Sequence, residues 1–222
     1  MEIKQVSTTH IDLFIRNDQY NFIKTQTKNL VNGHSTSRDV DVINALKSIA
    51  IERVFGLFID LKEEQRRLLD GIIDIENKEA AEQYLLQLKP YVIPFKELTV
   101  QSIKKLFPKA KKLMLPIEDI DLKETSYLCW DEKGSNKRFI IAPQQDKFIG
   151  IQGTFGNLNK SGICSICYQH SEVGLFMTEL KGPTIGTYSR KGNYICRDSQ
   201  KCNRNLITLE KLNKFILNLQ SL

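Results

Sequence analysis

Residues 1–89 repeat apolar and polar positions with the period of an α-helix. A first apolar set runs from Ile11 to Val31 and stops at Asn32-Gly33, which predicts the end of a helix. Ser37 is the predicted N-cap of a second helix, whose apolar stripe continues to Leu61 at three- and four-residue steps. Two shorter segments follow, with apolar residues at Leu68, Leu69, Ile72, Ile73, Ala80, Tyr84, Leu85 and Leu88. Four amphipathic segments with short polar breaks predict a small helical bundle.

From about residue 122 the apolar period becomes that of strands. Residues 126–130, 138–142 and 148–152 are short, rich in β-branched and aromatic residues, and separated by turn-forming stretches, which predicts an antiparallel meander. Residues 173–180, a strand ending at Cys196 and a helix over residues 208–219 complete this half. Pro90 and Pro94 break helices. The expected fold class is therefore α+β, with a helical bundle over residues 1–89 followed by an α/β domain with an antiparallel sheet over residues 90–222.

Four of the five cysteines fall in two close pairs. Two residues separate Cys164 from Cys167, and five separate Cys196 from Cys202. The first spacing lets both sulfurs face one point from a tight turn. The second spacing is wider, but a strand end followed by the start of a helix can bring Cys196 and Cys202 to the same point. Zn²⁺ binds four such ligands in a tetrahedron, and a helix N-terminus stabilises thiolates. The pattern predicts a treble-clef-like finger with one structural zinc bound by these four cysteines.

Other interpretations of the cysteines stay open at this point. Two disulfides or unrelated buried thiols are the alternatives, and paired cysteines at such spacings are more often metal ligands in a reducing compartment. His170, three residues after Cys167, is a substitute ligand that the pattern does not require. A catalytic zinc is disfavoured because four thiolates leave no open position for water. The fifth cysteine, Cys129, lies in a predicted strand as a small buried hydrophobe.

The chain has a net charge of +6, and this charge is unevenly distributed between its two halves. Residues 1–89 carry 12 basic and 14 acidic side chains, whereas residues 90–222 carry 20 and 12. Four zinc-bound thiolates lower the second balance by about two charges and leave it positive. A moderately basic surface suits an acidic protein or a phosphate backbone, and charge alone does not choose between them.

Several strings resemble the FusB/FusC-type fusidic acid resistance proteins, also described as elongation-factor-G-binding proteins. The most specific is Lys191-Gly-Asn-Tyr-Ile-Cys-Arg-Asp-Ser-Gln-Lys-Cys-Asn203, preceded by Gly162-Ile-Cys-Ser-Ile-Cys167 and Leu175-Phe-Met177. The likeness extends to Gln19-Tyr-Asn-Phe-Ile23, Tyr91-Val-Ile-Pro-Phe95 and Arg138-Phe-Ile-Ile141, so it covers nearly the whole chain.

The resemblance implies a function in translation. It implies a helical bundle followed by an α/β domain with a four-cysteine zinc finger, which grips elongation factor G through the factor's C-terminal domains. It also implies release of the factor that fusidic acid holds on the ribosome, so that resistance arises by target protection. The expected protein is a cytoplasmic monomer that needs neither a membrane nor direct contact with nucleic acid.

The same resemblance implies three partner-contact residues. They are Ile163, Lys191 and Tyr194, which flank the cysteines and are expected to share one small surface. Arg190, Arg197 and Lys201 join them on charge grounds. The competing interpretation makes Tyr194 a half-buried strand residue that packs on the finger and Lys191 a solvated turn residue.

Two other classes of function are alternatives to this one. The first is a zinc-finger protein that binds RNA or the ribosome through the basic half, although a dense row of basic residues interleaved with aromatics is absent from the finger. The second is an enzyme. The sequence shows no Ser–His–Asp set, no open metal site and no phosphate loop, and it holds three histidines, so a non-enzymatic protein is expected. No stretch approaches the ~20 apolar residues that span a bilayer.

Overall fold

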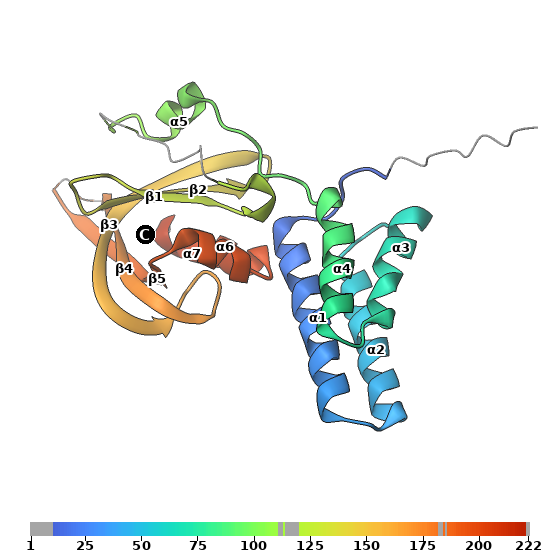
Figure 1. Ribbon diagram of the computed structural model, residues 1–222. Helices are drawn as coiled ribbons and strands as arrows, with labels where there is room; N and C mark the ends of the chain where they lie inside the picture. The colour runs from blue at the N-terminus through green and yellow to red at the C-terminus, as the bar shows by residue number, and fades with distance from the viewer. Residues whose placement is uncertain (1–10, 111–112, 114–119, 182–183, 185, 221–222) are drawn as a thin grey trace, which may run out of the picture. The chain divides into compact units, whose positions relative to one another are not determined.

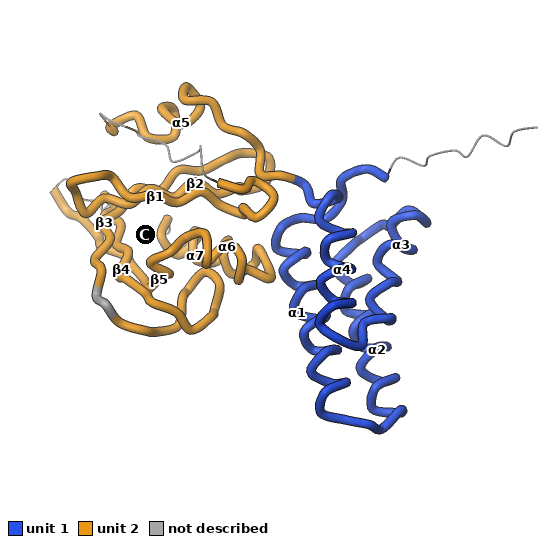
Figure 2. The backbone as a smooth tube through the Cα atoms, in the orientation of Figure 1, with its two compact units in different colours: residues 1–93 blue, residues 94–222 orange. Residues whose placement is uncertain are grey.

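The chain forms two compact units that divide between Ile93 and Pro94, four residues beyond the expected boundary (Figure 2). The computed structural model describes residues 11–110, 113, 120–181, 184 and 186–220, and only the backbone of residues 158 and 159. The first unit has one hydrophobic core, and the second has a core on each face of a sheet. Each unit therefore holds apolar packing of its own.

The first unit is helical, as the apolar period predicted. Its α-helices are α1 (Asn17–Thr36), α2 (Val40–Phe55), α3 (Glu63–Asp70) and α4 (Lys78–Leu88), with the 3₁₀ turns η1 (Gly71–Asp74) and η2 (Lys89–Tyr91) between and after them (Figure 1). Its core contains Ile15, Ile23, Leu30, Val54, Leu69, Ile72, Tyr84 and Leu88. The two chain segments that enter and leave the unit lie side by side, because Ile15 bridges Val92 and the Ile93 amide donates to the Ile15 carbonyl at 2.8 Å.

The helix ends differ from those that the sequence predicted. Helix α1 continues past Gly33 to Thr36, and the glycine lies against the end of the Leu46 side chain: a Cβ there would lie 2.4 Å from Leu46 Cδ1. The N-cap of α2 is Asp39, whose carboxylate accepts from two backbone amides, while Ser37 Oγ accepts from the Asp39 amide at 3.1 Å. Helix α2 ends at Phe55, so the apolar stripe that continued to Leu61 belongs partly to the following loop.

The second unit is built on one antiparallel sheet of five strands in sequence order. They are β1 (Leu128–Asp131), β2 (Lys137–Gln144), β3 (Lys147–Ile163), β4 (His170–Lys181) and β5 (Tyr188–Cys196). Around the sheet lie α5 (Val100–Leu106), η4 (Leu122–Glu124), α6 (Ser199–Asn205) and α7 (Leu209–Gln220). The α+β class is confirmed. Among the described residues, no helix combines the length and apolar character that crossing a bilayer requires.

Alternating strand residues fill two cores on opposite faces of the sheet. Ile140 packs with Phe176 and with Phe215 of α7, whereas its neighbours Phe139 and Ile141 pack against α5. Figure 1 shows the same arrangement, with α6 and α7 on one side of the sheet and α5 on the other. The core on the side of α6 and α7 also contains the four paired cysteines, so the predicted metal site is part of the hydrophobic interior.

Strand β3 is much longer than predicted. The sequence placed its end near residue 152, but the strand pairs with β2 up to Thr154 and with β4 from Thr154 to Ile163. Gly153 lies inside it because the space is crowded: a Cβ there would lie 2.4 Å from the Met177 carbonyl oxygen. The glycine thus permits close approach of two strands rather than marking a turn. The extra length brings the chain directly to Cys164.

Candidate metal centre and partner surface

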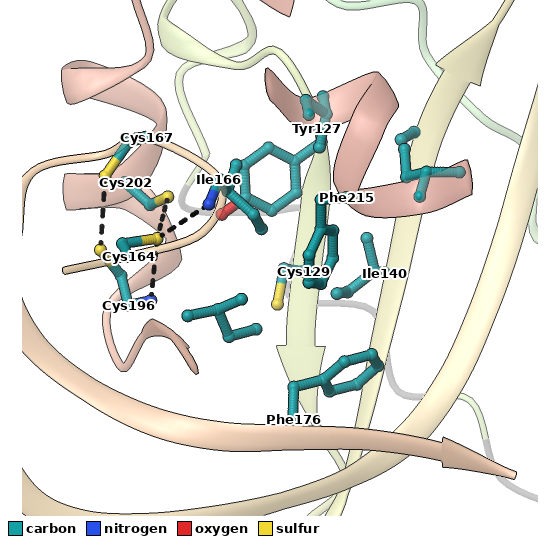
Figure 3. Packing of buried hydrophobic residues seen from close by; sticks show 14 of the residues in the cluster. Tyr127, Cys129, Ile140, Cys164, Ile166, Cys167, Phe176, Cys196, Cys202 and Phe215 are labelled. Carbon is teal, nitrogen blue, oxygen red and sulfur yellow. Dashed lines mark hydrogen bonds between the residues drawn. The ribbon is translucent and has the colours of Figure 1, made fainter. Parts of the chain in front are cut away.

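Four cysteines from three segments of the chain meet in the core of the second unit (Figure 3). Cys164 directly follows β3, Cys167 lies in the turn after it, Cys196 ends β5 and Cys202 lies in α6. All four are buried, with at most 4% of each residue exposed, and their Sγ atoms lie within 4.8 Å of one another. The structure therefore brings together the four residues that the cysteine spacing singled out.

The sulfur positions fit a tetrahedral zinc. Four sulfurs at about 2.3 Å from a central Zn²⁺ lie about 3.8 Å apart. The Sγ atoms of Cys164 and Cys202 are 3.7 Å apart, as are those of Cys167 and Cys196. A disulfide needs about 2.05 Å, and all four thiols are free. His170 is exposed and outside the group. Four cysteine ligands fill the coordination shell, so the cofactor is one structural zinc.

Backbone hydrogen bonds shape the turn that carries Cys164 and Cys167. The Cys164 amide donates to the Gln169 carbonyl at 3.1 Å, and the Tyr168 amide donates to the Cys164 carbonyl at 2.9 Å. Tyr168 has a φ of 57°, in the left-handed region. The amides of Ile166 and Cys196 both approach Cys164 Sγ at 3.3 Å. The zinc knuckle, residues 164–169, and the end of β5 therefore each direct one backbone donor at the Cys164 sulfur, which stabilises a thiolate.

The same surroundings act on the acidity of Cys164. Hydrogen bonds from the thiols of Cys167, Cys196 and Cys202 lower its pKa well below the ordinary value, while burial opposes them. Zinc binds cysteine as the thiolate, so metal binding displaces protons.

The second pair of ligands depends on a capped helix start. Asp198 is the N-cap of α6, and its carboxylate accepts from the amides of Gln200 and Lys201 at 2.8 and 3.0 Å. The next residue takes no part in the cap, because Ser199 Oγ donates to the Cys129 carbonyl at 3.1 Å. The cap starts the helix, which places Cys202 opposite the knuckle.

Asn203 fastens α6 to the start of the sheet. Its buried Oδ1 accepts from the amides of Ser126 and Tyr127 at 2.7 and 3.1 Å, and its Nδ2 donates to the carbonyls of Tyr127 and Ser199, both at 3.0 Å. The residue follows Cys202 directly. Sequence reasoning included Asn203 in a resembling string but gave it no role, because an asparagine normally indicates surface.

Replacing Asn203 with alanine is expected to destabilise the second unit by about 3 kcal/mol, because the loss leaves several buried backbone groups without partners. Thermal unfolding of the zinc-loaded chain measures the effect, with a melting temperature lower by roughly 10 °C. Asn205→Ala is the matched control, since Asn205 ends the same helix and is only partly buried. Equal melting temperatures for the two variants would show that Asn203 does not hold the helix in place.

Arg138 of β2 braces the strand that ends at Cys196. Its side chain is only 4% exposed, its Nε and Nη2 donate to the Asp131 carboxylate at 2.6 and 2.8 Å, and its guanidinium carbon lies 3.4 Å from the centre of the Phe155 ring. Nη1 and Nη2 also donate to the carbonyls of Cys196 and Arg197, each at 3.0 Å. In the sequence, Arg138 is noticeable only as part of the string Arg138-Phe-Ile-Ile141. The available signal was an arginine directly before the apolar strand residues Phe139, Ile140 and Ile141.

The predicted partner-contact residues surround this metal centre. Ile163 is 57% exposed just before the knuckle, and Tyr194 is 40% exposed two residues before Cys196, with its carbonyl accepting from the Ser165 amide at 2.8 Å. Two of the residues named on charge grounds pair with carboxylates, Arg190 with Glu179 and Arg197 with Glu172. The remaining one, Lys201, is exposed on α6.

The strand register separates Lys191 from Tyr194. Lys191 pairs with Thr178 and Tyr194 with Leu175, and strand residues three apart point to opposite faces. Lys191 shares its face with Ile195, which lies in the core with α7, so Tyr194 lies on the other face. Since β5 is an edge strand of the described sheet, both faces adjoin its open edge. The predicted contact residues therefore do not share one face of the sheet. They surround the open edge of β5 and the turn that carries Cys164 and Cys167.

The fold and the cysteine site together define a class of protein: a helical unit followed by a treble-clef zinc-finger unit. Residues 14–96 match the family model "Elongation factor G-binding protein, N-terminal", and residues 102–216 match "FBP C-terminal treble-clef zinc-finger". The chain therefore belongs to the family of elongation factor G-binding proteins with a C-terminal treble-clef zinc finger.

A solved structure supports this family membership. The fusidic acid resistance protein FusC is 33% identical in sequence to this chain and superimposes with a TM-score of 0.84. The similarity covers 96% of this chain and 100% of that one. The comparison with curated proteins gave no match.

Proposed function

We propose that this chain binds elongation factor G through its zinc-finger unit and promotes the release of the factor from the ribosome. In cells exposed to fusidic acid, this release gives resistance by target protection. The proposal rests on the family membership of both units and on the structural similarity to a fusidic acid resistance protein. It places the contact on the factor's C-terminal domains, in the cytoplasm, with one copy of the chain acting alone.

The observation that carries the proposal is the exposure of large apolar side chains beside a buried metal centre. Ile163 and Tyr194 are exposed, while the cysteines next to them in sequence are almost fully buried. Zinc fixes the backbone at both positions, so little conformational entropy is lost when a partner covers these side chains. Tyrosine anchors held on a rigid support are typical of binding hot spots.

Release of the factor sets a thermodynamic condition on this binding. A partner shifts an equilibrium only as far as its affinities for the two states differ. The chain must therefore bind the released or releasing conformation of the factor more tightly than the conformation that fusidic acid holds on the ribosome. Equal affinity for both conformations leaves the trapped complex unchanged.

Two measurements with purified components test the proposal. Calorimetry of the intact chain with elongation factor G is expected to show binding between the two proteins alone. Sedimentation of ribosomes carrying the factor and fusidic acid is then expected to show less factor in the ribosome pellet when the chain is added. Absence of binding in the calorimetry would contradict the proposal as a whole. Binding without release would contradict only the claim that the chain promotes release of the factor from the ribosome.

The proposal assigns no chemical turnover to the chain. Target protection requires that fusidic acid remain intact while translation resumes. Mass spectrometry of the drug after incubation with the zinc-loaded chain is expected to return the unmodified mass. A modified drug would establish an enzyme instead.

The basic second half keeps RNA binding as a second candidate. Residues 90–222 carry 20 basic and 12 acidic side chains, and Arg190 shares β5 with two exposed tyrosines, Tyr188 and Tyr194. Phosphate contacts make affinity fall steeply with salt, whereas a protein interface anchored by apolar side chains responds weakly. A salt titration of ribosomal RNA binding beside that of factor binding separates the two functions.

Tyr194→Ala is expected to raise the dissociation constant for elongation factor G at least tenfold, because it removes an exposed aromatic anchor next to Cys196. Lys191→Ala is expected to weaken binding several-fold, and both variants should keep their zinc and their circular dichroism spectrum. Tyr188→Ala is the matched control, since Tyr188 is a 60% exposed tyrosine on the same strand and farther from the metal. Equal affinities for the two tyrosine variants would contradict the assignment.

A further inference from the structure

A hollow lies between the zinc knuckle and helix α7. Its volume is about 270 Å³, below the ~300–1,000 Å³ of most small-molecule sites. Residues from four segments line it, among them Ile163 at the end of β3, Ser165 and Tyr168 of the knuckle, Asn193 on β5, and Lys211 and Lys214 on α7. Its size suits one or two protein side chains better than a cofactor.

The lining is positively charged. Lys211 and Lys214 contribute two ammonium groups, and none of the described residues that line the hollow carries a carboxylate. Within the described part of the chain, neither lysine forms an ion pair with an acidic side chain. Arg190 and Arg197, by contrast, already pair with Glu179 and Glu172. The two lysines are therefore better placed to receive a negative group from outside.

The knuckle side of the hollow is apolar and held in place. Tyr168 is 48% exposed, and its ring lies 4.3 Å from Lys211 Nζ, a cation–π contact between knuckle and helix. Its backbone is fixed by the hydrogen bond to the Cys164 carbonyl. Exposed Ile163 borders the same hollow. A partner that enters therefore meets an apolar rim on one side and two ammonium groups on the other.

We propose that this hollow receives an acidic side chain of the bound protein, with the carboxylate between Lys211 and Lys214 and adjoining apolar residues against Ile163 and Tyr168. This rests on the proposed function, in which the bound protein is elongation factor G. The proposal extends the contact surface from β5 to α7. It also identifies the group that the hollow recognises as a carboxylate. Charge complementarity at a site next to exposed apolar side chains sets both orientation and specificity.

Carbodiimide cross-linking of the intact chain to elongation factor G tests the contact directly. The reagent joins an amine to a carboxylate that touches it and adds no spacer. Mass spectrometry is expected to find Lys211 or Lys214 joined to an aspartate or glutamate of the factor. Lys133 and Lys147, exposed in the turn after β1 and at the start of β3, are internal controls in the same unit. Cross-links from the control lysines alone would overturn the proposal.

Charge reversal provides the second arm. Lys211→Glu with Lys214→Glu is expected to weaken factor binding more than tenfold and to flatten its salt dependence, whereas Lys133→Glu with Lys147→Glu should change it less than twofold. Zinc content and circular dichroism show whether each double variant is folded. If the charge-reversal variant is not, the neutral double variant Lys211→Gln with Lys214→Gln takes its place. Unchanged factor affinity overturns the inference, as does selective loss of RNA binding. Failure of the intact chain to bind the factor overturns the proposed function itself.

Discussion

Cys167→Ser is expected to lose zinc and unfold the second unit while the first unit keeps its helices. Structural zinc contributes about 10–16 kcal/mol of binding free energy, which is comparable to the ~5–15 kcal/mol that stabilises a typical domain. The cysteines belong to the same core as Ile140, Phe176 and Phe215, so loss of the metal opens that core. Elemental analysis is expected to show no zinc, circular dichroism to show the helix signal of the first unit alone, and calorimetry with elongation factor G to show no binding.

Cys129→Ala is the matched control for this prediction. Cys129 is buried in the same core but lies outside the metal cluster, and burial raises the pKa of its thiol to about 12, so it stays protonated. The alanine variant is expected to keep one zinc per chain and its affinity for the factor. A Cys167→Ser chain that carries a full complement of zinc, folds and binds normally would contradict the structural role of the metal.

The metal ligands could be predicted from sequence because the constraint on them is local. Cys164 and Cys167 must turn their sulfurs toward one point, and only a short spacing achieves this in a tight turn. Cys196 and Cys202 are separated by a strand end and a helix start, which Asp198 caps. Each of these features is confined to a few residues, so the sequence displays it directly.

Element boundaries were harder to predict, because the deciding contacts come from distant residues. Gly33 and Gly153 both look like breaks in a sequence pattern. In the structure they lie inside a helix and a strand. At Gly153 the backbone carbonyl of Met177 leaves no room for a Cβ, whereas at Gly33 the nearest atom is the end of the Leu46 side chain. A glycine required by close packing and a glycine required by a turn are identical in sequence, so only the tertiary structure distinguishes them.

The partner surface shows the same limit. The positions of Ile163 and Tyr194 beside cysteines were apparent from sequence, but the face on which each side chain lies depends on the strand register. The pairing of β4 with β5 sets Lys191 and Tyr194 on opposite faces. Tyr168 and Lys211 are 43 positions apart in the chain, and their contact follows from the packing of α7 against the knuckle.

Arg138→Ala is expected to destabilise the second unit by about 3–5 kcal/mol and to speed zinc loss. The guanidinium is the shared donor to the Asp131 carboxylate and to the carbonyls of Cys196 and Arg197. Its removal leaves buried acceptors unpaired and a cavity over the Phe155 ring. Because the Cys196 carbonyl loses its donor, the strand end that carries this ligand becomes less rigid. Urea unfolding and the rate of zinc transfer to a chromogenic chelator measure the two effects.

Two conservative variants separate charge from geometry at this position. Arg138→Lys keeps the charge but lacks the planar fork, so it is expected to recover only part of the stability. Asp131→Asn keeps the arginine and its bonds to the carbonyls; since the Asp131 side chain is half exposed, a loss of about 1 kcal/mol is expected. Stability should therefore fall in the order intact chain, Asp131→Asn, Arg138→Lys, Arg138→Ala. If zinc leaves all four proteins at one rate, Arg138 supports the sheet alone and has no part in holding the metal.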